Sequence, residues 1–430
     1  MATSGTNNLE KNFTVKLAKG VLDSFESLRV LSKNVNTQKL DGKFNPESGT
    51  TTLFKRPMDF TSTRSAGGDI SSGTRNDLVR GTAFGEVQDY ITTDVDFDEV
   101  EQALKLGNDE EEIYDRMAQR LVTDLEVDFA SYMMKNTGLT SGTTGTAITT
   151  WDHVAEMGSV LQSIGVPDRG MWCAAVNPYT QTSLASNQRS LGAGDGLVTS
   201  ANSTAMIAKN FAGLNVLAAT TLDTFTTGAG ADRAGTLTAT PTATYVAVKD
   251  SMQITVSVTA FQANLVVAAG ETFNAVLGVT DRLNLSTRNP VINGSGAAIV
   301  WSGTVVSTVT LDGSGAGNLV ISGPPIFEAG GQYNTVTAAL ASGAVCTLGG
   351  AASTTYQPNL FWHKNAFSIG SVPIKKLFST DTIATTKDGI QIRVSKYADG
   401  DANKNIVRVD IHPAYATLDP FFAGQGWGRA

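Results

Sequence analysis

The stretch from Arg116 to Asn136, "RMAQRLVTDLEVDFASYMMKN", decides the fold of this chain. Apolar residues recur in it at every fourth position: Met117, Leu121, Leu125, Phe129 and Met133. That spacing places them on one face of an α-helix. The acidic run Asp109–Glu112 lies just upstream, where carboxylates favour the N-terminal end of a helix dipole. The pattern therefore predicts one amphipathic helix of about 28 residues, roughly 40 Å long.

Two other textures precede this helix. Between Asn8 and Val35, apolar residues three or four apart predict an amphipathic helix, or two short ones, which needs a partner surface. Residues 50–97 then hold two extended stretches, "TTTLFKRP" and "GEVQDYITTDVDF", around a middle rich in Gly, Ser, Thr and Arg. Because that middle has too few apolar residues for a core of its own, we expect this two-stranded arm to pack against another subunit.

The chain downstream of the long helix predicts a mixed α and β region. Thr150 is the expected N-cap of a helix over residues 151–164, and Gly165 is its expected end. An apolar strand is expected over residues 171–176, and a weaker repeat of the same order ends at residues 214–219. Helix and strand therefore alternate through this part of the chain.

The sequence changes again between residues 224 and 356. Only ten charged residues occur there, helical periodicity disappears, and short β-branched runs are separated by Gly, Pro and Asn turns. We expect a β domain of about six or seven strands, either a small barrel or a sandwich. Because apolar strand sequence resumes at residues 359–367, the β domain is expected to be inserted into the mixed region.

The sequence holds little that points to catalysis. The Gly-rich stretch "LDGSGAGNL" at residues 311–319 lies between two expected strands, so a turn is favoured over a phosphate-binding loop. The histidines are far apart, and none has a metal-ligand partner at helical spacing; they are His153, His363 and His412. Cys173 and Cys346 are expected to be reduced and buried. We therefore assign no cofactor, no catalytic residue and no metal ligand, and we expect no enzyme.

The composition is that of a soluble globular chain that does not coat nucleic acid. Hydrophobic residues make up 41% and charged residues 17% of the 430 residues, and the formal net charge is −8. A protein of that charge is repelled by phosphate. The first residues carry no export signal, and no apolar run approaches the roughly 20 residues of a membrane helix. We expect a cytoplasmic product without a membrane partner.

Charge is distributed unevenly along the chain. Residues 86–128 carry fifteen acidic residues and three basic ones, whereas residues 55–80 carry five basic and three acidic ones. Opposite signs on neighbouring segments can serve solubility alone, or the arm of one subunit can lie over the acidic helix of the next. The candidate basic residues are Lys55, Arg56, Arg64, Arg75 and Arg80. The candidate acids are Asp109, Glu110, Glu111 and Glu112, or another acid of residues 86–128.

The polar stretch "KYADGDANKN" at residues 396–405 spaces Asp399, Asp401 and Asn403 like the first ligands of a calcium loop. Alternating apolar residues on both sides predict two flanking strands, whereas a calcium loop has two flanking helices. Lys404 also occupies the sixth position, where glycine is needed. A weak, incomplete cation site is the less favoured alternative. We expect the tip of a β-hairpin.

Five quoted stretches follow one another in an order that resembles a known family. They are "ITTDVDFDEVEQALKL", "RMAQRLVTDLEVDFASYMMKN", "TTWDHVAEMGSVLQSIGVP", "PNLFWHKNAF" and "IRVSKYADGDANKN". The chain resembles, over essentially its whole length, the major capsid proteins of short-tailed lambdoid phages that infect Salmonella and Shigella. The resemblance implies an α+β HK97-like phage capsid fold. Such a fold has an N-arm, an extended E-loop, a P-domain with a long spine helix and an A-domain, and this group adds an all-β, barrel-like insertion domain.

The resemblance also implies domain boundaries in this chain. We expect an N-terminal arm and helix over residues 1–45, and the E-loop with an adjoining P-domain strand over residues 46–97. The other expected ranges are 98–136 for the spine helix, 137–223 for the first part of the A-domain, 224–356 for the insertion domain, 357–380 for the return of the A-domain, and 381–430 for the P-domain hairpin and C-terminus. Asp399 and Asp401 at the hairpin tip are then expected to meet other subunits where capsomers join.

The implied function is structural. Copies of such a protein form the hexamers and pentamers of an icosahedral shell, expected at T=7, from a procapsid that expands as DNA is packaged. The implied partners are a scaffolding protein, a portal protein at one vertex and double-stranded DNA held only by weak non-specific contact. Assembly in the cytoplasm of the host bacterium and a final place in the virion follow. A bacterial nanocompartment shell of the same fold stays an alternative. A β-rich surface adhesin would need an export signal, and a hydrolase would need a catalytic cluster.

Overall fold

A computed structural model describes residues 9–37, 40, 49–65, 67–71, 75–98, 110–190, 206–275, 280–378, 381–399 and 404–429. The chain divides into two compact units, and each is assembled from three separate stretches. Unit 1 comprises Met1–Thr52, Gly85–Phe129 and Ser368–Ala416. Unit 2 comprises Leu53–Phe84, Ala130–Phe367 and Thr417–Ala430.

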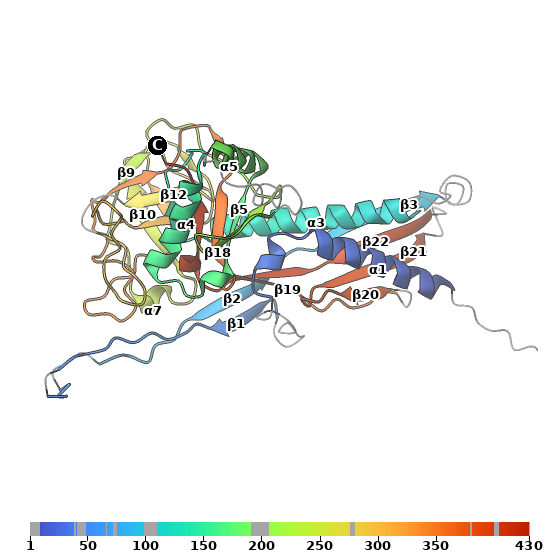
Figure 1. Ribbon diagram of the computed structural model, residues 1–430, viewed down its shortest axis with the longest axis horizontal. Helices are drawn as coiled ribbons and strands as arrows, with labels where there is room; N and C mark the ends of the chain where they lie inside the picture. Colours follow the sequence, from blue (N-terminus) through green and yellow to red (C-terminus); the bar gives the residue numbers. More distant parts are fainter. Residues whose placement is uncertain are drawn as a thin grey trace, which may run out of the picture. The chain divides into compact units, whose positions relative to one another are not determined.

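The predicted hairpin forms the centre of unit 1. Strands β21 (Gln391–Asp399) and β22 (Lys404–Ile411) pair antiparallel, and the sheet order is β20-β21-β22-β3. The two outer strands are β20 (Thr382–Thr385) and β3 (Ile91–Asp98). Helix α1 (Leu9–Leu28) contacts β20 and β21 and lies across this sheet (Figure 1). The expected N-terminal helix is therefore confirmed, and the short 3-10 helix η1 (Ser32–Asn34) follows it.

The long helix is also confirmed. Helix α3 (Glu110–Lys135) has 26 residues, close to the predicted length. Its apolar stripe is buried as the spacing required, with Leu121, Leu125 and Phe129 each fully inaccessible to solvent. The Phe129 ring packs against Tyr415 of unit 1 at a centroid distance of 5.1 Å. The helix belongs to unit 1 through Phe129 and to unit 2 from Ala130 onward.

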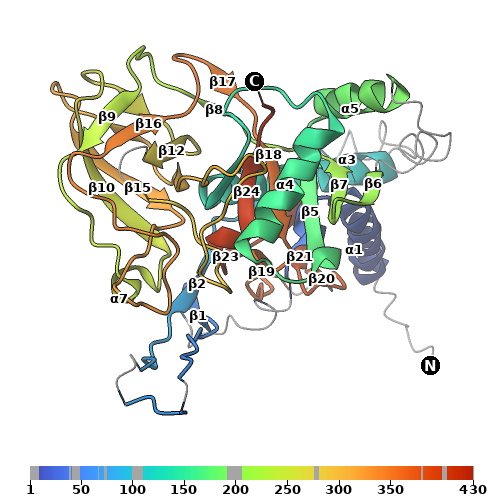
Figure 2. The ribbon, with the colours of Figure 1, turned by 60° about the vertical axis from the view of Figure 1, so that its left-hand side comes forward.

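Unit 2 contains a six-stranded sheet covered by α4 (Trp151–Ile164). The strand order is β4-β24-β18-β5-β7-β6, in which β5 runs parallel to β7 and antiparallel to β18. Figure 2 shows α4 lying over β5, β18 and β24. The strands are β4 (Leu139–Ser141), β5 (Trp172–Val176), β6 (Met206–Phe211), β7 (Leu214–Ala218), β18 (Asn359–His363) and β24 (Ala423–Gly426). The mixed α and β organisation expected for this region is confirmed, and α5 (Pro178–Ser190) completes it.

The two ends of α4 test the expected N-cap at Thr150 and the expected end at Gly165. Gly165 adopts a left-handed conformation at φ 92°, and its N–H bonds the carbonyls of Gln162 and Leu161, as expected for a glycine that ends a helix. Thr150 is the N-cap residue, but its side chain makes no capping hydrogen bond. The Nδ1 atom of His153 instead accepts from the Thr149 N–H at 3.3 Å. Thr150 therefore occupies the expected N-cap position, but its side chain does not make the hydrogen bond that usually accompanies it.

A closed barrel occupies the β-rich part of unit 2. Its order is β10-β15-β13-β12-β16-β9, and its inward side chains include the buried Val256, Phe273 and Leu319. The barrel strands are β9 (Ala234–Leu237), β10 (Gln253–Thr259), β12 (Thr272–Ala275), β13 (Ser302–Val305), β15 (Gly317–Ser322) and β16 (Val345–Leu348). Two small sheets accompany them, β11-β14 (Val266–Val267 with Val309–Thr310) and β8-β17 (Phe225–Thr226 with Thr355–Tyr356). Strand β5 pairs with both β7, which precedes the barrel in the chain, and β18, which follows it.

The Gly-rich stretch at residues 311–319 is a turn, as predicted. It links β14 to β15, and Asp312 Oδ1 accepts hydrogen bonds from the N–H groups of Ser314 at 2.8 Å and Ala316 at 2.9 Å. The carboxylate therefore already satisfies the loop's backbone donors, which are the groups that a phosphate would use.

The extended arm is shorter than the sequence predicted. Strands β1 (Thr51–Lys55) and β2 (Thr82–Val87) lie in a four-stranded sheet, ordered β1-β2-β23-β19, with β23 (Pro413–Thr417) and β19 (Phe367–Ser371). Residues 91–97, which the residue pattern alone grouped with the arm and in which the resemblance allowed for an adjoining strand, lie in β3, and β3 pairs with β22 over its whole length. The remaining arm consists of the loop of residues 56–81 and the adjoining ends of β1 and β2, from Leu53 to Phe84, and Figure 2 shows it extending away from the rest of unit 2. Alternating apolar residues could not distinguish a strand of the arm from a strand of the hairpin sheet.

Candidate interaction surfaces

The arm exposes several large apolar side chains. Those with more than half of their surface exposed are Leu53 at 60%, Phe60 at 53%, Ile70 at 55% and Leu78 at 81%. Burial of apolar surface contributes about 25 cal/mol per Å², so each of these side chains favours contact with a partner. The expectation that the arm packs on another subunit stays a prediction.

The basic candidates on the arm separate into two kinds. Lys55, Arg64, Arg75 and Arg80 are exposed. Arg56 is only 6% exposed, and its guanidinium donates through Nη1 to the Leu418 carbonyl and through Nη2 to the Asp250 carbonyl at 3.2 Å. Burial lowers the pKa of Arg56, and the nearby Asp419 carboxylate raises it in part. The structure thus uses the charge of Arg56 inside its own chain.

The root of the arm is held on one side by the segment that follows α7 (Tyr245–Val248). Asp250 Oδ1 accepts from the Thr82 N–H at 2.9 Å and from Thr82 Oγ1 at 2.7 Å. Lys249 Nζ donates to the other carboxylate oxygen at 2.8 Å, and this bond contributes most to a lowered Asp250 pKa of about 2. A Cβ on Gly81 would lie 2.3 Å from the Lys249 carbonyl oxygen, so only glycine permits this approach.

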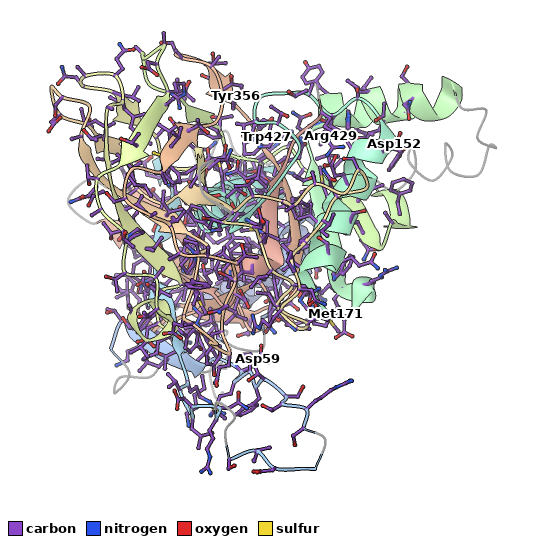
Figure 3. All side chains as sticks on the ribbon, turned by 90° about the vertical axis from the view of Figure 1, so that its left-hand side faces the viewer. Asp59, Asp152, Met171, Tyr356, Trp427 and Arg429 are labelled. Atoms are coloured by element: carbon purple, nitrogen blue, oxygen red, sulfur yellow. The ribbon has the colours of Figure 1, made fainter. Side chains whose placement is uncertain are left out.

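The root is held on the other side by two segments next to the barrel. The Arg288 guanidinium forms an ion pair with Asp59 and donates to the Asn334 carbonyl at 2.6 Å. Burial lowers the pKa of Arg288, whereas Asp59 raises it. Gln332 Nε2 donates to the Asp77 carbonyl at 2.8 Å, and Gln332 Oε1 accepts from the Asp77 N–H at 3.0 Å. Figure 3 shows Asp59 where the arm leaves the body of unit 2.

The acidic candidates lie partly outside the described residues. Asp109 is among the residues that the structure does not describe, and Glu110, Glu111 and Glu112 open helix α3 with side chains that it does not describe. Asp399 ends β21, where its backbone pairs in register with Lys404, and its side chain is likewise not described. Asp401 also lies outside the described residues. Their expected contacts with other subunits therefore stay predictions.

Other acids of residues 86–128 have partners within the subunit. Asp96 forms an exposed ion pair with Lys404 at 2.6 Å, which lowers the Asp96 pKa through its hydrogen bond to that ammonium. Asp128 accepts from the Tyr415 hydroxyl at 2.9 Å, and Glu126 is buried at 2% exposure. The exposed acids of this range include Glu86, Asp89, Asp94 and Asp115.

The described residues hold no cluster of side chains suited to a metal ion. No group of three or more His, Cys, Asp or Glu side chains is placed to hold a metal ion among them, and residues 400–403 of the calcium-like loop fall outside them. Cys173 and Cys346 are buried free thiols, as expected, and burial raises their pKa values to about 11 and about 12. No helix in the described part is both long and apolar enough to cross a membrane.

Sequence reasoning missed the residues that hold the arm. The pairs Asp59–Arg288, Asp77–Gln332 and Thr82–Asp250 are 229, 255 and 168 residues apart in the chain. Local periodicity carries no information on such pairs, because it reports only on neighbours within a helix or strand. The one available hint was the scarcity of charge between residues 224 and 356, which made each of its ten charged residues a candidate for a specific role.

Two sequence comparisons agree over almost the whole chain. Residues 1–428 match the model of the family described as "P22 coat protein - gene protein 5". The chain is 37% identical, over 426 residues, to the major capsid protein of Acyrthosiphon pisum secondary endosymbiont phage 1. That alignment covers 98% of this chain and 99% of the relative.

Solved structures give a more distant likeness. A structure of Mycobacterium phage Che8 has a TM-score of 0.43 at 12% identity and covers 89% of each chain. The capsid of a native GTA particle has a TM-score of 0.42 at 8% identity and covers 94% of this chain and 92% of the other. A virus-like particle from Pyrococcus furiosus has a TM-score of 0.38 at 9% identity, with coverage of 96% and 98%. The family of this chain is therefore established by the two sequence matches and not by these structures.

Proposed function

Because this chain belongs to the P22 coat protein family and is the major capsid protein of a tailed phage, we propose that its copies assemble with a scaffolding protein into a procapsid that later expands. The single observation that carries this proposal is the family match over residues 1–428. The arm supports it, because a loop without a core and with exposed apolar side chains suits the repeated contacts between subunits of a closed shell. Many such modest contacts add up through multivalency.

The finer steps follow from the same proposal. The shell consists of hexamers and pentamers on a T=7 lattice, with a portal protein at one vertex. Double-stranded DNA inside makes only weak non-specific contact, which the net charge of −8 favours because a shell that gripped DNA would hinder packaging and ejection. Assembly takes place in the host bacterial cytoplasm, the mature protein is part of the virion, and no enzymatic activity is involved.

The parts of the described chain can be assigned to the HK97-like fold that the resemblance implied. Helix α3 is then the spine helix, the sheet of β20, β21, β22 and β3 belongs to the P-domain, and residues 56–81 belong to the E-loop. The six-stranded sheet with α4 is the A-domain, and the closed barrel is the insertion domain of residues 224–356. Family membership supports this assignment, and the nanocompartment alternative is the less favoured one.

The proposed contact between neighbours is electrostatic as well as apolar. The exposed bases of the arm, Lys55, Arg64, Arg75 and Arg80, would pair with acids of residues 86–128 on the next subunit. The exposed acids Glu86, Asp89 and Asp94 are candidates for it, along with Asp109 to Glu112, and Asp115 is exposed but also accepts from Ser24 Oγ at 3.1 Å. Arg56 is left out because its guanidinium is already bonded within its own chain. Complementary charges of this kind orient an encounter and suppress wrong partners.

Expression with and without a scaffolding partner tests the proposed function. Electron microscopy should show closed shells of uniform size when the partner is present, and irregular or open assemblies when it is absent. A protein that stays monomeric under both conditions would contradict the proposal. Closed, uniform shells from this chain alone would favour the nanocompartment alternative.

Charge reversal tests the contact between arm and acids. Glutamate at Lys55, Arg64, Arg75 or Arg80, one at a time, is expected to lower the shell yield by about tenfold at the position that pairs, since like charges then face each other. Combining that variant with Asp94→Arg or Glu86→Arg should restore the yield for the true pair. Lys376→Glu, which reverses an exposed base outside the arm, is the control and should assemble normally. Unchanged assembly in all four single variants would rule the contact out.

A further inference from the structure

We infer that each subunit sets the direction of its own arm, and that Arg288, Gln332 and Tyr333 are positioning residues for the contact that the arm makes with a neighbour. The three side chains come from outside the arm, yet each bonds an arm residue in unit 2. This inference rests on the proposed function, because it assigns a task to an arm that acts between subunits.

The arm consists of an outgoing and a returning segment. Each segment is hydrogen-bonded to unit 2 near the point where it leaves the body of that unit. On the outgoing side, Asp59 forms the ion pair with Arg288, and its N–H reaches the Tyr333 hydroxyl at 3.5 Å. On the returning side, Asp77 and Val79 bond Gln332 and Tyr333. The outgoing and returning segments are thus bonded to one small group of side chains, which fixes the angle at which the arm leaves the unit.

The hydrogen bonds on the returning segment go to backbone groups of the arm. Gln332 accepts from the Asp77 N–H and donates to the Asp77 carbonyl, so its amide pairs with that residue as a neighbouring strand would. The Tyr333 hydroxyl donates to the Val79 carbonyl at 2.7 Å. Bonds to backbone groups constrain the path of the chain whichever side chains the arm carries. Their target is therefore the position of the arm and not its surface chemistry.

The holding side chains are themselves fixed. The Tyr333 ring stacks on Tyr245 with centroids 3.6 Å apart and planes within 7° of parallel. Asn334 Oδ1 accepts from the Glu328 N–H at 2.8 Å, and Asn334 Nδ2 donates to the Glu328 carbonyl at 2.8 Å. Arg288 is tied to the same turn through the Asn334 carbonyl. A rigid holder can set an angle, whereas a mobile one could only tether the chain.

A fixed arm lowers the cost of assembly. Association must otherwise order the loop, which costs conformational entropy for each backbone residue that is fixed. An arm that already points toward its contact presents Phe60, Ile70 and Leu78 without that cost, and it excludes contacts at other angles. Loss of the three positioning side chains should therefore leave the barrel folded and release the arm.

Limited trypsin digestion of unassembled subunits tests the release. The peptide bond between Arg80 and Gly81 lies next to Val79, whose carbonyl bonds Tyr333. The peptide bond after Arg64 lies in the distal arm and serves as an internal reference. In Arg288→Gln and Tyr333→Phe, cleavage after Arg80 should accelerate by about tenfold relative to Arg64, since proteolysis follows local opening. Tyr333→Phe keeps the stacked ring, so any change is due to the lost hydroxyl.

Arg429→Gln is the matched control. Arg429 also pairs with a carboxylate in unit 2, Glu156 at 3.2 Å, and Figure 3 shows it far from Asp59. It should leave cleavage after Arg80 unchanged. Thermal unfolding should be similar in all variants, which separates release of the arm from loss of the fold. The exchanged pair Asp59→Arg with Arg288→Asp adds a trypsin site after residue 59, so only the ratio of cleavage after Arg80 to cleavage after Arg64 is compared, and that ratio should return to the wild-type value.

Electron microscopy of shells made with a scaffolding partner supplies the second measurement. Arg288→Gln and Tyr333→Phe, the variants expected to release the arm, should give shells of mixed size and curvature. The exchanged pair should restore uniform shells. Unchanged cleavage after Arg80 in both released variants would overturn the inference whatever shells form. Faster cleavage with normal shells would overturn the positioning role while the proposed capsid function stands. Failure of the wild-type chain to form shells would count against the proposed function alone.

Discussion

Asp410→Ala is expected to lower the free energy of unfolding of the unassembled subunit by about 3–5 kcal/mol, because it strands a buried arginine. Asp410 is fully buried in β22, and its Oδ2 accepts from Arg393 Nε at 3.0 Å and also from Arg393 Nη2. Its Oδ1 accepts from Arg408 Nε at 2.6 Å and from Thr92 Oγ1 at 2.8 Å. Arg393 is itself only 5% exposed, so its charge cannot turn to solvent. Denaturant unfolding followed by circular dichroism measures the loss.

A neighbouring pair in the same sheet provides the control. Asp96 and Lys404 form an ion pair of similar length, but their side chains are 57% and 46% exposed. Exposed pairs are screened by solvent and contribute little, so Asp96→Ala should leave the free energy of unfolding nearly unchanged. The double variant Asp410→Leu with Arg393→Met should recover most of the stability, because it removes the unpaired charge as well as its partner. A loss below about 1 kcal/mol in Asp410→Ala would show that water or a rearranged side chain satisfies Arg393.

The elements that periodicity encodes were predictable from the sequence. The buried stripe of α3 follows from apolar residues four apart, and the hairpin of β21 and β22 follows from strict alternation on both sides of a polar turn. The left-handed Gly165 at the end of α4 follows from the conformational freedom of glycine. In each case the decisive interactions lie between residues close in sequence, or depend only on which face of an element is apolar.

The contacts that organise the arm were not predictable in the same way. Arg56 looked like one of five equivalent bases, yet burial against the carbonyls of Leu418 and Asp250 gives it a different role. Residues 91–97 looked like part of the arm from their alternation alone, yet they pair with β22. Both outcomes depend on which distant segment lies opposite, which tertiary folding decides and local composition does not record. The exposure of the arm itself was predictable, because its middle lacks apolar residues for a core.

Glu126→Ala is expected to lower the free energy of unfolding of the unassembled subunit by about 2–5 kcal/mol. The reason is that this one carboxylate of α3 accepts the hydrogen bonds of the turn that follows α1. Oε2 accepts from the N–H groups of Val30 at 3.3 Å and Leu31 at 2.6 Å. Oε1 accepts from the Ser32 N–H at 3.0 Å and from the Ser32 hydroxyl. Leu31 and Ser32 are fully buried, so water cannot replace the lost acceptor. Removal leaves buried donors unpaired at about 1–3 kcal/mol each.

Glu126→Gln separates this account from a simple loss of packing. An amide has the shape of the carboxylate but only one acceptor oxygen, and its NH₂ group would face an N–H that needs an acceptor. The glutamine variant should therefore lose about half or more of what the alanine variant loses. Asp124→Ala removes a more exposed carboxylate from the same helix, paired with Arg120 at 2.9 Å, and should change stability by less than about 0.5 kcal/mol. A glutamine variant as stable as the wild type would mean that shape, and not the two acceptor oxygens, holds the turn against α3.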